Sequence, residues 1–256
     1  MKWPTRLGLV VAIAMLSGAL LAAEKSEAPE KKAEESWATE PFNGKNLDGW
    51  KVKGPKEKNK WTVGVAAVDP ENPRCLVAKK GKGEMVNVVS GHGQGLDFYS
   101  TAKWGDCRIE LEVMVPKDSN SGIYVMGEYE IQILDSYGKK KIGGGDMGAI
   151  YGAKPPKVNA SKKPGEWQKY GIDFRAPRFD ADGKKTANAV FLKVTLNGQV
   201  LHENVEMTSS TGGALTGREH STGPIMFQGN HGPVAYRNIR ITPLEEKQAT
   251  EAPKKK

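Results

Sequence analysis

The feature that most constrains the fold is a two-residue alternation in the stretch "SNSGIYVMGEYEIQILDSYG", residues 119–138. Its odd positions supply an apolar set, namely Ile123, Val125, Tyr129, Ile131 and Ile133. Its even positions supply a different set, namely Tyr124, Met126, Glu128, Glu130 and Gln132. Successive side chains of a strand point to opposite faces. The pattern therefore predicts strand structure that buries the apolar set between two sheets and turns two carboxylates and an amide to the other side.

The rest of the chain shows the same short alternating runs, separated by Gly, Pro, Asn and Asp. Examples are "CRIELEVMVP" (107–116), "AVFLKVTLNGQVLHENV" (189–205) and "GPIMFQGNHGPVAYRNIRITPL" (223–244). Within the second, Asn197-Gly198 fits a two-residue type I′ hairpin turn, because both residues tolerate positive φ. Helical periodicity is nearly absent, so the chain is predicted to be an all-β sandwich of two antiparallel sheets. "DADG" (180–183) lacks the further acidic ligands of a calcium loop and is read as a hairpin turn.

Composition along the chain predicts four segments. Residues 1–23 have Lys2 and Arg6 before an apolar run and end in Ala22-Ala23, which is typical of a signal peptide and too short for a membrane span. Residues 24–38 form a charged, flexible leader, residues 39–245 one domain, and residues 246–256 a disordered basic tail. We therefore expect export, to the periplasm or the medium, without stable membrane insertion after cleavage.

The positive charge does not by itself indicate a nucleic-acid-binding protein, and the two cysteines do not by themselves indicate a disulfide. The full chain carries a net charge of +8, but its lysines cluster at 139–141, 162–163 and 254–256, beside no nucleic-acid motif. We read them as solvated loops and expect no nucleic-acid partner. Cys75 and Cys107 are the only cysteines. Export would permit a disulfide, but Cys107 alternates with apolar residues, so burial as a small hydrophobe explains it without a bond and is the favoured alternative.

One long segment interrupts the strands directly after the carboxylate-bearing stretch. Residues 136–166 contain seven glycines and three prolines and no convincing strand. A loop of this length in a compact domain usually serves a function or is disordered. We expect it to pack over the rim of the carboxylate face, with Tyr151 reaching towards that face. Its "GGGDMG" (143–148) matches a dinucleotide fingerprint formally, but "AIYGAKPP" cannot open the helix that such a site needs.

Two groups of side chains could carry acid–base chemistry. Glu128, Glu130 and Gln132 would stand on one strand face at intervals of about 6.5–7 Å, and carboxylates at that spacing in an enclosed site raise each other's pKa. The alternative is an edge strand with solvated charges. His231, in "FQGNHGP", has an ordinary pKa that suits proton transfer, although a histidine between glycines can also be a simple turn residue.

A series of ordered motifs resembles one family. They are "FNGKNLDGW" (42–50), "NSGIY" (120–124), "YEIQILDSYG" (129–138), "GAIYG" (148–152), "PGEW" (164–167), "LNG" (196–198) and "IMFQGNHGPVAYRNIRI" (225–241). Together they resemble the 3-keto-disaccharide hydrolase domain family, also described as 3-keto-glucoside 1,2-lyase and 3-keto-2-hydroxyglucal hydratase. The resemblance extends over about residues 42–244 and implies a concanavalin A-like lectin/glucanase β-sandwich, or jelly roll.

The resemblance also implies a reaction, in which a carboxylate removes the C2 proton of a 3-keto-glycoside, the C1 substituent leaves, and water adds to the product. Glu130 is then the expected base and His231 the expected acid. The expected substrate-binding residues are Glu128, Gln132, Asp135, Asn120, Tyr151 and Gln228. A small carbohydrate is the expected partner; no protein partner is indicated, no cofactor is specified, and a divalent metal supporting the enolate is left open.

Two other functions stay open at this point. A non-catalytic carbohydrate-binding module would keep the sandwich without needing perturbed acids. A laminarinase-type glycoside hydrolase is the weaker reading, because Gln132 stands where such enzymes carry the middle acid of their strand motif. Retaining hydrolysis needs a nucleophile and an acid about 5–5.5 Å apart, and that substitution argues against it.

Overall fold

The structure is a computed structural model that describes Met1 and residues 38–245. The described residues do not include the expected signal peptide beyond Met1, nearly all of the leader, or the basic tail. The structure therefore does not test the predictions for these segments. Within 38–245 the chain forms strands and a single 3-10 turn, η2 (Lys56–Lys58). No helix in this range is long and apolar enough to cross a membrane.

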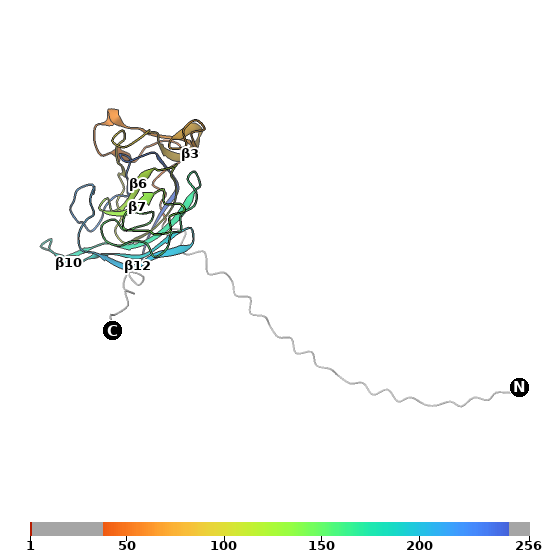
Figure 1. Cartoon of the computed structure of the whole chain (residues 1–256). Coiled ribbons are helices and arrows are strands. Elements are labelled where there is room, and N and C mark those ends of the chain that lie inside the picture. Colours follow the sequence, from red (N-terminus) through yellow and green to blue (C-terminus); the bar gives the residue numbers. More distant parts are fainter. Residues whose placement is uncertain (2–37, 246–256) are drawn as a thin grey trace. The chain divides into compact units, whose positions relative to one another are not determined.

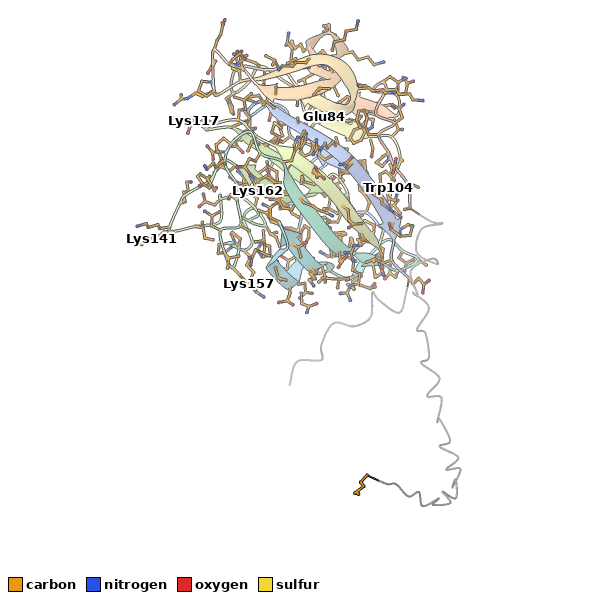
Figure 2. All side chains as sticks on the ribbon, turned by 90° about the vertical axis from the view of Figure 1, so that its right-hand side faces the viewer. Glu84, Trp104, Lys117, Lys141, Lys157 and Lys162 are labelled. Atoms are coloured by element: carbon orange, nitrogen blue, oxygen red, sulfur yellow. The ribbon has the colours of Figure 1, made fainter. Side chains whose placement is uncertain are left out.

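The larger sheet has seven strands, all paired antiparallel, which lie side by side in Figure 2. In spatial order they are β12 (Gln199–Met207), β11 (Ala189–Leu196), β8 (Gln168–Arg175), β5 (Cys107–Met114), β14 (Val234–Pro243), β3 (Leu76–Asn87) and β2 (Trp61–Val68). Along β5 the apolar residues alternate with Arg108, Glu110 and Glu112, as the sequence predicts. Lys141 and Lys157 project from the periphery in Figure 2, and Lys162 likewise lies outside the strands.

The smaller sheet has five antiparallel strands and contains the stretch that prompted the fold prediction. In spatial order they are β1 (Trp50–Val52), β4 (Phe98–Ser100), β13 (Met226–Phe227), β6 (Asn120–Val125) and β7 (Tyr129–Leu134). β6 and β7 lie near the centre of the domain in Figure 1. A separate hairpin pairs β9 (Arg178–Phe179) with β10 (Lys185–Ala187), which confirms that "DADG" is a turn.

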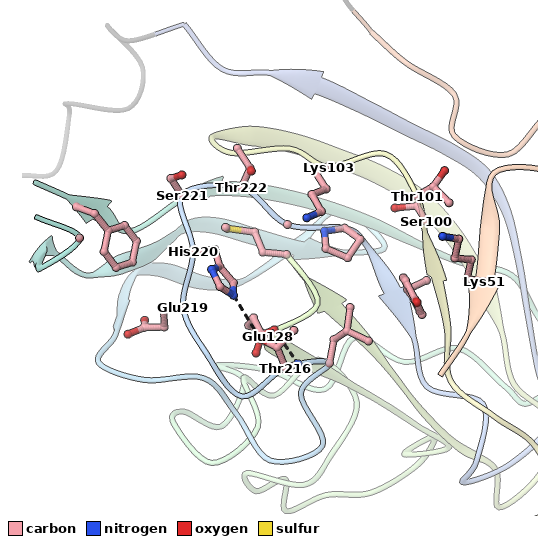
Figure 3. A pocket seen from close by; sticks show the side chains of 17 residues that line it. Lys51, Ser100, Thr101, Lys103, Glu128, Thr216, Glu219, His220, Ser221 and Thr222 are labelled. Atoms are coloured by element: carbon pink, nitrogen blue, oxygen red, sulfur yellow. Dashed lines mark hydrogen bonds between the residues drawn. The ribbon is translucent and has the colours of Figure 1, made fainter. Parts of the chain in front are cut away.

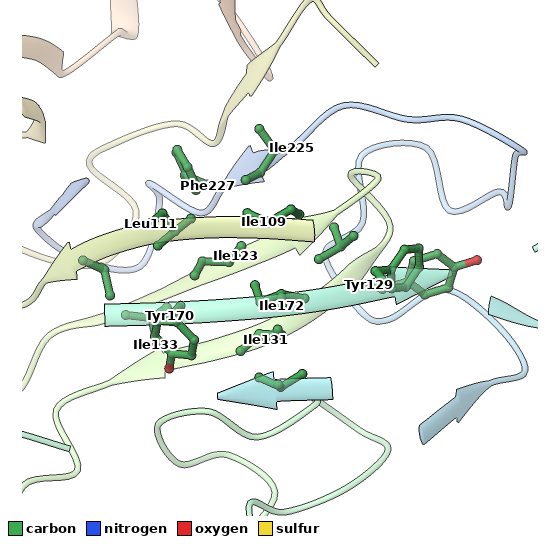
Figure 4. Packing of buried hydrophobic residues seen from close by; sticks show 14 of the residues in the cluster. Ile109, Leu111, Ile123, Tyr129, Ile131, Ile133, Tyr170, Ile172, Ile225 and Phe227 are labelled. Atoms are coloured by element: carbon green, nitrogen blue, oxygen red, sulfur yellow. The ribbon is translucent and has the colours of Figure 1, made fainter. Parts of the chain in front are cut away.

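The core lies between the two sheets, and Figure 4 shows its central side chains. The four residues predicted to be buried there, Ile123, Val125, Ile131 and Ile133, are at most 1% exposed. They belong to one cluster with Ile109, Leu111, Tyr170 and Ile172 of the facing sheet. Burying a side chain of this size contributes about 1.5–3 kcal/mol. The prediction of a two-sheet sandwich with the apolar set inside is confirmed.

The turn between β11 and β12 and the long loop between β7 and β8 lie where the sequence predicts them. Asn197 and Gly198 both have positive φ, 52° and 82°, between β11 and β12, as the predicted type I′ turn requires. No strand lies between Leu134 and Gln168. Instead, residues 148–151 run along the free edge of β7: Tyr151 N donates to Glu130 O, and Gln132 N donates to Ala149 O. The long loop therefore covers the edge of the carboxylate strand, which excludes a bare, solvated edge.

Cys75 and Cys107 are both free thiols, and both are buried. Burial, with Asp106 and Asp173 nearby, raises the pKa of the Cys107 thiol to about 12. Cys107 is thus a small apolar residue of the core, and the disulfide that export would permit is not formed.

Candidate active site

The candidate site lies on the outer face of the smaller sheet, opposite the core. Pairing places Gln132 opposite Gly122 and Glu130 opposite Tyr124 on β7 and β6. Gln228, directly after β13, donates its backbone N–H to Gly122 O and so continues the first of these rows. Because the core residues occupy the alternate positions, these side chains share the outward face.

Glu130 is a carboxyl group that is almost completely buried in this face. Its side chain is only 2% exposed, in the space that a side chain at Gly122 would fill, since a Cβ there would overlap Glu130 Oε1. Burial raises the pKa of Glu130 to about 7; hydrogen bonding from Tyr124 opposes the shift, and the charge of Asp97 adds to it. A carboxyl group with a pKa near neutrality can accept and return a proton at physiological pH.

Tyr124 and Gln228 surround this carboxylate with hydrogen-bonding groups. The Tyr124 hydroxyl lies 2.9 Å from Gly212 O and accepts from Gln228 Nε2 at 3.4 Å. Burial and the Glu130 charge hold the pKa of Tyr124 well above its usual range, so the hydroxyl stays protonated and can donate. The Gln228 Oε1 acceptor is buried without a partner in the described chain. A native protein rarely buries an unpaired acceptor, so this oxygen points to a ligand group or water at the site.

Asp97 joins this cluster from a remote part of the sequence. It precedes β4, is 6% exposed, and accepts a hydrogen bond from Gly229 N at 3.1 Å. Gly229 must be glycine, since a Cβ would overlap Leu96 O. Asp97 also lies 4.0 Å from the Lys53 ammonium group.

His231 follows β13 in the chain and lies close enough to Asp97 for that charge to influence it. Its ring packs edge-on against His92 with centroids 4.5 Å apart, and it is half-buried. Burial and His92 lower the pKa of His231, whereas Asp97 raises it. Asp97 thus influences the protonation of both Glu130 and His231. The neutral imidazole is therefore the main form at neutral pH, which suits a hydrogen-bond donor to a developing oxyanion.

The other predicted substrate residues divide into two groups. Gln132 and Asn120 belong to the cluster: Gln132 Nε2 donates to Asn120 Oδ1 at 3.0 Å, and Asn120 remains partly exposed. Asp135 instead accepts backbone hydrogen bonds from Asp118 at 3.0 Å and from Tyr137 at 3.3 Å, which shapes the turn.

Tyr151 pairs through its backbone with the Glu130 strand, but its side chain is 43% exposed. That side chain lines a shallow cavity of about 550 Å³ with Gly144 and Lys154. The long loop thus lies along the edge of the Glu130 strand, and the Tyr151 side chain lies beside a hollow that its own loop forms.

Glu128 does not stand on the strand face with Glu130, because β7 begins at Tyr129 and Glu128 belongs to the preceding turn. Its side chain is 1% exposed and accepts hydrogen bonds from Thr216 N and Oγ1 at 3.0 and 2.7 Å and from Gly217 N at 3.0 Å. The predicted stripe of three polar residues is therefore wrong at its first member. This carboxylate anchors the loop that crosses the sheet at residues 211–217.

Two residues of the cluster were not among the sequence candidates for the site, Asp97 and Tyr124. Tyr124 could have been found, since it stands on the same strand parity as Glu130. Asp97 carries no local signal, because only sheet pairing brings its segment beside Gln228. Within residues 38–245, no three His, Cys, Asp or Glu side chains come together as a metal-ligand group.

The domain is a concanavalin-like β-sandwich of two antiparallel sheets. A buried, titratable cluster lies on one of its outer faces. The particular family follows from the sequence: residues 37–242 match the model of the 3-keto-alpha-glucoside-1,2-lyase-like domain. The chain belongs to this family, and the resemblance found in its motifs is confirmed.

Solved structures agree with this assignment. A candidate glycosyl hydrolase from Parabacteroides distasonis ATCC 8503 has 31% identity and a TM-score of 0.60, with 82% of this chain and 84% of that chain covered. A second candidate glycosyl hydrolase from the same organism has 18% identity and a TM-score of 0.55, with 82% and 94% covered, and is similar in fold. No curated protein sequence matches the chain. The family and these neighbours place the domain among carbohydrate-active enzyme-like proteins.

Proposed function

We propose that this domain cleaves 3-keto-glycosides by removal of the C2 proton, elimination at C1 and hydration of the product. The observation that carries the proposal is Glu130, a buried carboxyl group whose pKa of about 7 fits a base for a carbon acid. The unpaired acceptor of Gln228 beside it supports a polar ligand at the same place. Family membership supplies the substrate class.

In the first step, Glu130 takes the proton from C2, and the electron pair of that C–H bond delocalises onto the C3 oxygen as an enolate. A ketone at C3 makes this proton acidic for that reason. The enolate oxygen needs hydrogen-bond donors, and the protonated Tyr124 hydroxyl serves as one when its proton turns from Gly212 O to the substrate.

In the second step, the C3 carbonyl re-forms, a C1–C2 double bond forms, and the C1–O bond to the leaving group breaks. The departing oxygen requires a proton, which His231 supplies from its imidazolium form, the minor form at neutral pH because its pKa is lowered. Water then adds across the double bond: its oxygen bonds to C1, its released proton passes to the His231 imidazole, and the protonated Glu130 returns a proton to C2. Gln132, Asn120 and Gln228 would orient the sugar hydroxyls, consistent with their place in the same face.

The test is aglycone release from a 3-keto-glucoside and from its unoxidised parent. We expect release from the ketone only. Glu130→Gln should lower the rate by about 10²–10⁴-fold and abolish exchange of the C2 hydrogen with heavy water, while His231→Gln should slow release but retain that exchange. Glu166→Gln makes the same chemical change at an exposed position and should behave as wild type.

The outcomes separate the competing functions. Release from the unoxidised glycoside would favour a glycoside hydrolase. Binding without turnover of either compound would favour a carbohydrate-binding module. Full activity in Glu130→Gln would contradict the assignment of the base.

We also propose that the protein acts outside the cytoplasm, in the periplasm or the medium, since residues 1–23 have the composition of a signal peptide. Sequencing the N-terminus of the protein recovered from those fractions should place the new end at Glu24. An intact N-terminus in a cytoplasmic fraction would contradict export.

A further inference from the structure

A second hollow lies on the outer face of the smaller sheet, apart from the Glu130 cluster. It is a cavity of about 660 Å³, drawn in Figure 3. Lys51 and Tyr99 are paired across β1 and β4, and Tyr99 is paired with Met226, which is paired with Tyr124 beside Glu130. The cavity therefore shares a sheet face with the candidate active site.

The crossing loop at residues 211–217 separates the two places. Tyr124 OH donates to Gly212 O, and Lys53 Nζ donates to Gly213 O and Ala214 O at 2.9 and 2.8 Å. Leu215 N donates to Gly127 O at 2.7 Å, and the Leu215 side chain lines the cavity. These bonds tie the loop down along its length, so the cavity is a distinct hollow with its own lining.

The lining combines an apolar floor with polar groups at the rim. Tyr99, Met126, Leu215 and Pro224 supply the apolar surface, and Met126 is 4% exposed. Threonine and serine hydroxyl groups lie around them at 101, 221 and 222. A cavity of several hundred Å³ with an apolar floor and a few polar groups is typical of a small-ligand site. Such a surface suits a sugar ring, which has an apolar face and an equatorial ring of hydroxyls.

The cavity lining contains two lysines whose ammonium groups have no partner among the described residues, and two carboxylates that are already bonded within the protein. The ammonium groups of Lys51 and Lys103 are exposed and form no hydrogen bond or ion pair within residues 38–245. Glu219, in contrast, is paired with Lys185 at 2.6 Å and accepts from Tyr129 OH at 2.7 Å. Glu128 is fully occupied by the loop bonds described above. His220 also faces the cavity (Figure 3).

We propose that this cavity binds an acidic saccharide, with the sugar ring on the Tyr99 and Met126 floor and its carboxylate or sulfate at Lys51 and Lys103. The two acids of the lining do not compete for these ammonium groups, because both carboxylates already have protein donors. Ammonium groups at an open rim recognise anions as point charges, so the interaction should weaken as salt rises.

The test is calorimetric binding of a glucuronic acid-terminated disaccharide, a matched glucose-terminated disaccharide and inorganic sulfate to the intact protein. We expect the acidic disaccharide to bind at least tenfold more tightly than the neutral one at low salt. The double variant Lys51→Gln/Lys103→Gln should remove that difference and leave the weak binding of the neutral sugar unchanged. A matched control, Lys79→Gln/Lys117→Gln, changes two exposed lysines outside the cavity lining and should bind as wild type does.

Each other result counts against the proposal. Equal binding of the acidic and neutral sugars, or an unchanged preference in the double variant, would overturn it. Sulfate bound as tightly as the acidic disaccharide would show an anion site without a sugar subsite. Because the measurement uses unoxidised sugars, repeating it in Glu130→Gln keeps the result independent of the proposed lyase reaction.

Discussion

Replacing Glu130 by Gln should remove a pH-dependent contribution to stability whose size can be calculated. In the folded protein burial raises the pKa of Glu130 to about 7, whereas an unhindered glutamate titrates at 4.5. The folded state therefore keeps a proton that the unfolded chain loses between those two values. Stability from this group is fully present below about pH 4.5 and is lost as the pH rises to about 7, because the unfolded state binds fewer protons there.

The magnitude follows from the size of the shift. Each pKa unit corresponds to about 1.4 kcal/mol, so the charged form of Glu130 costs the folded state about 3 kcal/mol at pH 8. Gln carries no charge and avoids this cost while occupying almost the same volume. The free energy of unfolding of Glu130→Gln, relative to wild type, should therefore rise by about 3 kcal/mol between pH 4.5 and pH 8.

Urea unfolding of both proteins at several pH values measures this difference, and subtraction cancels every group that the substitution leaves alone. Glu166→Gln, at an exposed side chain, is the matched control and should show a flat difference. A flat difference for Glu130→Gln, or one that falls with pH, would refute the argument that burial suppresses its charge.

Three further substitutions test the packing around the site. Gly122→Ala should displace the Glu130 carboxylate and lower kcat/KM by about 10²-fold, with circular dichroism unchanged, and wild-type kinetics would show that the close approach is unimportant. Ile131→Ala should lower the free energy of unfolding by about 2–5 kcal/mol in urea, and a loss under 1 kcal/mol would argue against its place in the core. Glu128→Gln should cost about 1–3 kcal/mol and expose the loop at Thr216 to proteolysis, and unchanged protection would contradict its anchoring role.

The sequence alone determined which side chains face inward, because strand geometry turns every second residue to the same side. For Ile123, Ile131 and Ile133 this local rule needed no knowledge of distant residues, and it also placed Glu130 on the opposite face. Motif order added the family and the polar candidates Gln132 and Gln228. The predictions of burial and of the Asn197-Gly198 turn succeeded because periodicity and turn chemistry act over a few residues.

Only the tertiary structure decided which polar groups meet. The local rule continued the stripe to Glu128, but a turn breaks the strand there, and a loop almost ninety residues later supplies the donors that bind this carboxylate. Asp97 reaches the site because Gly229 allows its own backbone to approach that of Leu96 closely. No residue near Asp97 in the sequence indicates this approach. The pKa of Glu130 depends on the same long-range packing, since desolvation arises from whatever segments cover a group. Pairing between remote strands is a property of the whole folded chain. It therefore determined which polar groups lie around Glu130 and how strongly its pKa is raised, neither of which follows from alternation along one strand.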